Sequence, residues 1–153
     1  NLYGVGTVQE EVGLRGARTA ANMLHPDVAI ALDVTTSMDT PMDKGINGLG
    51  KGVVLSVMDA GIIANKNFIA KMEEICKDLD LDINYDMMTC GGTDADNIHK
   101  AHDGVVTMTL SIPTCYMHSH RLIIHRKDYW QTVLLMAEFA RRLDNELLQI
   151  LKG

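Results

Sequence analysis

The feature that most constrains the fold is the run of residues 2–16, which joins an apolar segment, an acidic pair and a glycine-punctuated turn. Residues 2–9 have the apolar character of a buried strand. Residues 15–24 suit a helix that ends at the His25-Pro26 break. A strand followed directly by a helix is the repeating unit of α/β proteins, so the run favours a sheet with flanking helices.

The remaining chain continues this alternation of short apolar runs and helical stretches. Apolar runs predict strands at 28–34, 53–58, 82–88, 105–112 and, as a short edge strand, 121–125. Helical spacing predicts helices at 67–79, 94–101 and 127–151. Residues 35–52 carry Pro and several Gly with little periodicity, which predicts a long loop. This order predicts an α/β fold with a mostly parallel sheet and flanking helices.

Composition excludes several classes of protein. A chain of 153 residues is one domain or part of one. Its net charge of -6 argues against binding to nucleic acid, which requires a basic face. No apolar run approaches the ~18 residues of a membrane span, so we expect no membrane contact. Three cysteines without metal-type spacing indicate reduced thiols in a cytoplasmic protein: Cys76, Cys90 and Cys115.

Five side chains with metal-ligand or acid–base chemistry fall at or just beyond predicted strand ends: Glu10, Glu11, Asp33, Asp94 and His118. In open α/β sheets, sites form at the carboxyl ends of the strands. Successive strand residues point to opposite sides, so one residue of the Glu10-Glu11 pair can hold a metal while the other faces substrate. Metal-assisted hydrolysis needs one ligand and one general base that is not a ligand.

The motifs around these residues resemble those of the tetrahedral (TET-type) aminopeptidases, the glutamyl and deblocking enzymes of a dinuclear-metal exopeptidase clan. Residues 8–16 read Val-Gln-Glu-Glu-Val-Gly-Leu-Arg-Gly, and residues 29–35 read Ala-Ile-Ala-Leu-Asp-Val-Thr. Leu-Gly-Lys-Gly at 49–52, Gly-Gly-Thr-Asp-Ala at 91–95 and Tyr-Met-His-Ser at 116–119 follow in the family's order. The resemblance covers nearly the whole chain and implies a phosphorylase/hydrolase-like zinc-exopeptidase catalytic domain.

The resemblance also implies roles for individual residues. Glu10 matches the general base that activates the attacking water, and Glu11 matches a ligand of one metal together with His118. Asp33 matches a ligand of the second metal. Two divalent ions are implied per active site, zinc or cobalt. The family's active-site loop matches Gly91, Gly92, Thr93 and Asp94.

Other family features have no counterpart in this sequence. The family has an upstream histidine ligand, an upstream aspartate that bridges both metals and an inserted oligomerisation domain. We therefore expect residues 1–153 to be the C-terminal portion of the catalytic domain, with an incomplete ligand set and no useful peptidase activity alone. The parent protein is expected to act on peptides as a homo-oligomer. Cys115 stands where relatives often have Arg, which puts contacts of that loop in doubt.

Simpler interpretations stay open for each residue. An acidic pair is by default a solvated patch, Asp33 and Asp94 could cap a turn or a helix, and a single histidine is more often at the surface than a ligand. The chain could be a non-catalytic folded fragment or a partner-binding module. It could also belong to another amide hydrolase or a carboxypeptidase of the same metal clan.

Overall fold

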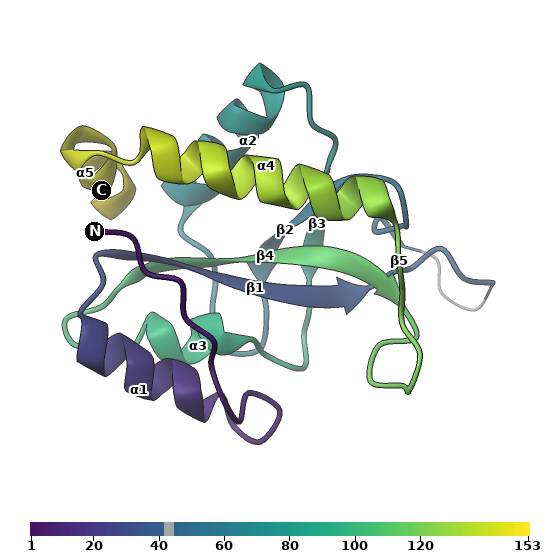
Figure 1. Ribbon diagram of the computed structural model, residues 1–153, viewed down its shortest axis with the longest axis horizontal. Helices are drawn as coiled ribbons and strands as arrows, with labels where there is room; N and C mark the ends of the chain where they lie inside the picture. The colour runs from purple at the N-terminus through teal and green to yellow at the C-terminus, as the bar shows by residue number, and fades with distance from the viewer. Residues whose placement is uncertain (42–44) are drawn as a thin grey trace.

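The computed structural model, which describes residues 1–41 and 45–153, places a sheet between two layers of helices (Figure 1). Its strands are β1 (Val28–Thr36), β2 (Val53–Met58), β3 (Ile83–Met87), β4 (Val106–Cys115) and β5 (Ile123–Ile124). Its helices are α1 (Arg15–Leu24), α2 (Lys66–Asp78), α3 (Asp94–Ile98), α4 (Arg126–Arg142) and α5 (Asn145–Lys152). Helices α2 and α4 cover one face of the sheet, and α1 and α3 cover the other (Figure 1). None of the helices in the described ranges combines the length and the apolar composition that a membrane span requires.

The strand order is β1-β4-β2-β3, with β5 paired to β4. Strands β1 and β4 are parallel, as are β2 and β3, whereas β2 runs antiparallel to β4. The predicted α/β architecture with a mostly parallel sheet is therefore confirmed. The two parallel pairs run in opposite directions. The carboxyl ends of β1 and β4 therefore lie at one end of the sheet, and those of β2 and β3 lie at the other end.

The face of the sheet beneath α2 and α4 is apolar. Alternate residues of β2 and β4 point to this side, since side chains along a strand alternate between faces. They form the main core with residues of the two helices, where the rings of Phe68 and Phe139 stack at a centroid distance of 4.9 Å. The fully buried members from strands and helices include Val53, Leu55, Met72, Ile75, Met108, Leu110 and Leu135.

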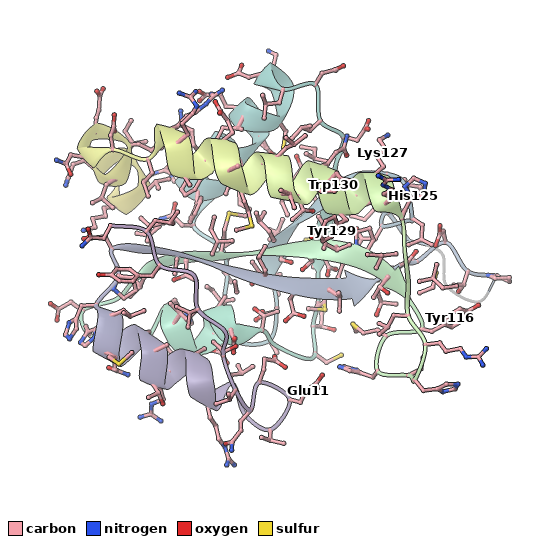
Figure 2. The ribbon with its side chains drawn as sticks, viewed as in Figure 1. Glu11, Tyr116, His125, Lys127, Tyr129 and Trp130 are labelled. Carbon is pink, nitrogen blue, oxygen red and sulfur yellow. The ribbon has the colours of Figure 1, made fainter. Side chains whose placement is uncertain are left out.

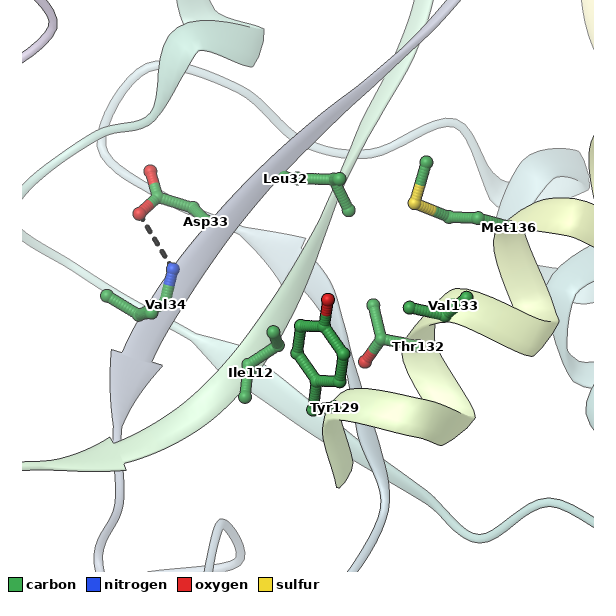
Figure 3. Close-up of a pocket in the computed structure, with 8 residues that line it drawn as sticks. All are labelled: Leu32, Asp33, Val34, Ile112, Tyr129, Thr132, Val133 and Met136. Carbon is green, nitrogen blue, oxygen red and sulfur yellow. Dashed lines mark hydrogen bonds between the residues drawn. The ribbon is translucent and has the colours of Figure 1, made fainter. Parts of the chain in front are cut away.

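The opposite face of the sheet is polar although it is also buried. Its buried polar residues are Thr35, Ser56, Asp86, Thr107, Thr109 and Ser111. Buried polar groups need hydrogen-bond partners, and here the strands supply them. The Oγ atoms of Ser56 and Ser111 lie 3.3 Å apart, and the Thr35 hydroxyl donates to the Asp86 carboxylate. Asp33 points to this face and away from α4 (Figure 3).

Most predicted elements are confirmed within one to three residues, and α1 and β2 have the predicted bounds. The strand predicted at residues 2–9 is wrong. That segment forms no strand, and its apolar side chains lie at the surface, with Leu2 84% and Val8 67% exposed. A strand is stable only when neighbours satisfy its backbone groups, and no described strand pairs with residues 2–9.

Two further boundaries differ from the predictions. Strand β4 continues through Pro113, where we expected it to end. Proline removes one backbone donor, but Pro113 falls between the residues of β4 that pair with β2 and those that pair with β5. The helix predicted at 127–151 is two helices, because Leu143 is extended and the side chain of Asp144 accepts a hydrogen bond from the Leu147 N–H at 2.8 Å.

The loop after β1 was predicted for residues 35–52, and its residues 42–44 lie outside the described residues. Asp128 of α4 fixes the end of this loop. Its wholly buried carboxylate accepts hydrogen bonds from the backbone N–H groups of Gly50 at 2.7 Å and Gly52 at 2.8 Å. Gly52 has a φ of +104°, and a Cβ there would lie 1.9 Å from the Asp82 carbonyl oxygen, so only glycine fits.

We expect Asp128→Ala to lower the free energy of unfolding by about 3 kcal/mol, because two N–H groups lose a charged acceptor and are left unpaired. Urea denaturation followed by circular dichroism measures this change. Asp103→Ala is the matched control, since Asp103 is an exposed aspartate outside the helices and strands. Equal unfolding midpoints for the two variants would show that Asp128 does not hold the loop.

Candidate active site

The acidic pair lies in a tight turn that leads into α1. The backbone N–H groups of Gly13 and Leu14 both donate to the Glu10 carbonyl, at 3.1 and 2.8 Å. The turn closes on itself where the Gly16 N–H donates to the Val8 carbonyl at 2.9 Å. A Cβ on Gly16 would lie 2.4 Å from the Val8 nitrogen, so the close approach requires glycine. The turn therefore fixes the backbone that carries Glu10.

Glu11 faces the loop that follows β4. Its Oε2 lies 3.4 Å from His118 Nε2, and the side chains are 72% and 67% exposed. His118 has a φ of +58° in a turn where the Ser119 N–H donates to the Tyr116 carbonyl at 3.1 Å. Figure 2 labels Glu11 and Tyr116 on two loops that lie on the α1 side of the sheet. A carboxylate oxygen and an imidazole nitrogen thus meet at an open position.

Two further carboxylates lie deeper, on β1 and at the start of α3. Asp33 Oδ1 accepts a hydrogen bond from the Val34 N–H at 2.7 Å. Asp94 Oδ2 accepts one from the Thr7 hydroxyl at 2.6 Å, while the buried Asp94 Oδ1 has no partner among the described residues. Burial raises the pKa of Asp33, and the charges of Asp94 and Glu11 raise it further, against the bond from Val34.

Glu10 is electrostatically coupled to the same group. Burial raises its pKa above the ordinary 4.5, and repulsion from Asp33, Glu11 and Asp94 adds to this, whereas His118 opposes it. A carboxylate with a raised pKa is a stronger proton acceptor than a solvated one. The structure therefore brings together the five residues that the sequence singled out, and their arrangement suits proton transfer next to an open Glu11–His118 pair.

The expectation that all five residues lie at strand ends is only partly right. Glu10 and Glu11 follow no strand, so the alternation argument for their opposite directions does not apply. Asp33 lies inside β1, which runs on to Thr36. Asp94 follows β3, and the carboxyl end of β3 lies at the end of the sheet opposite that of β1. Residues 88–93 lead from β3 to α3, which begins with Asp94. His118 does lie just beyond the end of β4.

The loop at residues 91–94 has mixed surroundings. Gly91 and Gly92 are exposed, and Gly91 has a φ of +81°, which favours glycine. Thr93 is 2% exposed, and its hydroxyl lies 2.7 Å from the Thr109 hydroxyl of β4. Thr93 occupies the N-cap position of α3, so Asp94 is the first helical residue and not the cap. Thr93 thus joins this loop to the sheet and fixes the position of Asp94.

Two residues near the site were not predicted. Thr7 donates to Asp94, and Asp59 accepts the N–H groups of Gly61 and Ile62 at 2.8 and 3.0 Å beside Thr93. No local sequence motif identifies Thr7.

The polar face of the sheet could have been predicted from β4, because Thr107, Thr109 and Ser111 alternate with apolar residues along this strand.

The donor types at the site fit a divalent metal, since carboxylate oxygens and an imidazole nitrogen suit zinc or cobalt. Within residues 1–41 and 45–153, however, no three His, Cys, Asp or Glu side chains converge closely enough to hold a metal ion. The Glu11–His118 pair supplies two donors. These residues therefore fit a metal in chemistry but form only part of a coordination shell.

A pocket of about 420 Å³ lies between β1 and α4 and shares Asp33 with this group. It is largely apolar, and Asp33 contributes to its lining while its carboxylate points away from the ring of Tyr129 (Figure 3). Other lining residues are Leu32, Ile112, Val133 and Met136. This pocket holds no cluster of acid–base groups, so the candidate site is the acidic group on the opposite face.

Comparisons with known proteins agree on one family. The family model described as M42 glutamyl aminopeptidase matches residues 1–135. The chain is 38% identical to the lysyl aminopeptidase of Pyrococcus furiosus over 94% of its own length and 41% of that protein. It superposes on the TET aminopeptidase from Thaumarchaeota archaeon SCGC AB-539-E09 with a TM-score of 0.92 and 36% identity, over 95% of this chain and 42% of that one.

Another similar structure, the TET1 peptidase of Pyrococcus horikoshii, can assemble into a tetrahedron or a large octahedral shell. Its TM-score is 0.73 at 34% identity, over 90% of this chain and 40% of that one. The chain thus spans about two fifths of the length of the relatives it matches.

Replacing Glu10 with Gln should stabilise the fold near neutral pH and have little effect below the ordinary pKa of a carboxyl group. A raised pKa in the folded state means that stability falls as pH rises through that value, so the charged Glu10 costs free energy at neutral pH. Urea midpoints measured at about pH 7 and about pH 3 test this. Glu146→Gln, an exposed control on α5, should not show the same pH dependence. A Glu10→Gln midpoint below that of the unmodified chain at neutral pH contradicts the prediction.

Proposed function

This chain belongs to the M42 glutamyl aminopeptidase family, and on that premise we propose that it is part of the catalytic domain of an enzyme that removes N-terminal residues from peptides. The observation that carries the proposal is that Glu10, Glu11, Asp33, Asp94 and His118 lie within electrostatic range of one another, with Glu11 and His118 in contact. In this proposal, residues 1–153 are the C-terminal portion of that domain.

The proposed site takes two divalent ions, zinc or cobalt. Glu11 and His118 would hold one ion, and Asp33 would contribute to the other. A histidine and a bridging aspartate outside this sequence would complete the shells, consistent with a chain that spans 42% of a similar enzyme's length. When bound, the ions would polarise the scissile carbonyl and lower the pKa of water.

Glu10 is the proposed general base. One of its carboxylate oxygens would take a proton from the attacking water and later donate it to the nitrogen of the leaving amine. Burial, the first cause of the raised pKa of Glu10 and one that bound cations would not remove, supports both steps, because it makes the carboxylate more basic and lets the carboxyl group hold the proton between them. The turn from Val8 to Gly16 would keep this side chain in place through the reaction.

The parent protein is proposed to be a homo-oligomer acting on peptide substrates. The TET1 peptidase of Pyrococcus horikoshii, which resembles this chain, can assemble into a tetrahedron or a large octahedral shell. A closed shell would restrict the substrate to unfolded peptides that can enter it.

The second candidate is a folded chain without turnover of its own. It is favoured by the incomplete donor set, because the described residues offer no group of three metal-binding side chains. The two candidates differ in whether added metal gives activity to this chain alone.

Calorimetric titration of the chain with Zn²⁺ and Co²⁺ should give weak binding, since Glu11 and His118 supply only two donors. Glu11→Ala and His118→Ala should each abolish it, whereas His120→Ala, an exposed neighbour, should not. Tight binding together with metal-dependent peptide turnover by the chain would show that the ligand set is complete. Binding that survives both variants would remove Glu11 and His118 from the metal site.

In the longer protein that contains this chain, Glu10→Gln should lower kcat by about 10²–10⁴-fold, the usual effect of losing a general base. Metal content should stay unchanged, because Glu10 is not a proposed ligand. Release of free amino acids from a peptide measures the activity, and an N-acetylated copy of the peptide should resist cleavage. Cleavage of the acetylated peptide from its carboxyl end would identify a carboxypeptidase instead.

A further inference from the structure

A polar groove lies between α1 and α3, apart from the acidic group. Its volume is about 290 Å³, just below the usual range of small-ligand pockets. Four of its five lining residues carry positive charge or a side-chain amide: Arg18, Asn22, Asn97 and Lys100, with Ala101 as the fifth. The chain has a net charge of -6, yet none of the residues that line this groove is a carboxylate.

Arg18 supplies a guanidinium without a partner. No ion pair or side-chain hydrogen bond joins it to another residue in the part of the chain that the structure describes. Only its backbone is engaged, since its carbonyl accepts the Asn22 Nδ2–H at 2.8 Å. A guanidinium presents planar paired donors that match the two oxygens of a carboxylate or phosphate. The paired N–H donors of the Arg18 guanidinium are therefore available to an anion.

Lys100 brings a second positive charge to the groove. Its ammonium contacts the Asp96 carboxylate, which is not among the lining residues, and the Lys100 side chain is still 56% exposed. Asp96 offsets one of the two positive charges and orients Lys100. The groove retains a net positive charge, with ammonium and guanidinium on neighbouring helices.

Asn97 makes one wall of the groove rigid. Its Nδ2 donates to the Leu14 carbonyl at 2.9 Å and to the Gly13 carbonyl at 3.3 Å. These bonds tie α3 to the turn that begins α1, so the two helices cannot separate easily. A preformed groove loses less entropy when it binds a small ligand than a mobile surface does.

We propose that the α1–α3 groove binds a small oxyanion, a carboxylate or a phosphate. The Arg18 guanidinium donates to two oxygens of the anion. The Lys100 ammonium and the second N–H of the Asn22 amide donate to the other oxygens of a phosphate, or to the same two oxygens of a carboxylate, each of which can accept more than one hydrogen bond. The site is separate from the acidic group, whose negative charges repel anions. Nothing in this proposal depends on peptidase activity.

The test is a titration of the isotope-labelled chain with inorganic phosphate and, separately, with acetate, followed by amide NMR shifts. Acetamide, which has the shape of acetate without its charge, is the ligand control. Arg18→Gln and Lys100→Gln are compared with Arg126→Gln, which removes an exposed arginine of α4. Retained amide dispersion shows that each variant is folded.

We expect saturable shifts at the groove residues, and a dissociation constant raised about tenfold or more by Arg18→Gln, as expected for loss of a charge-assisted bond. Lys100→Gln should weaken binding, and Arg126→Gln should not. Binding of phosphate alone or acetate alone would support the site and name its anion. Shifts that do not saturate, equal shifts with acetamide, unchanged binding in Arg18→Gln or Lys100→Gln, or equal weakening in Arg126→Gln would overturn the proposal.

Discussion

The parallel pairing of β1 with β4 is the interaction on which the rest of the structure depends. Its register runs from Val28 opposite Val106 to Thr36 opposite Thr114 and sets Asp33 beside Ser111. Both strands leave the sheet at the same edge, which brings the loop with His118 over the end of β1. Because side chains along a strand alternate between the two faces, the apolar residues of β4 point toward α4 and its polar residues point toward α3. The core and the candidate site are therefore consequences of one pairing.

The second constraint is electrostatic. Several carboxylates share one face of the sheet with few cations near them, and burial together with mutual repulsion raises the pKa of Glu10 and of Asp33. Such a group costs folding free energy while all its members are charged. Hydrogen bonds from Val34 to Asp33 and from Thr7 to Asp94 offset part of that cost. The cations proposed for this site would offset the remaining repulsion between the carboxylates, which connects the raised pKa values to the proposed chemistry.

Local sequence patterns predicted the elements whose stability is mainly local or buried. The amphipathic spacing of residues 67–79 matched α2, and the β-branched run at 53–58 matched β2. Both predictions were correct because the apolar residues of these two elements pack into the same hydrophobic core. The predictions failed where the structure of a segment depends on pairing with other strands. The apolar residues 2–9 predicted a strand that no described strand pairs with. Pro113 continues β4 at a position between the residues that pair with β2 and those that pair with β5.

The sequence by itself determined the family, the α/β class and the identity of the acidic and imidazole groups, because each is written in short motifs or in local periodicity. Tertiary structure alone decided which of these groups meet. Asp94 lies close enough to raise the pKa of Asp33 because residues 88–93 lead from β3 to α3 on this face of the sheet. Glu11 contacts His118 although the two loops that carry them are more than a hundred positions apart. Contacts between distant segments depend on strand direction and register, which no local pattern encodes.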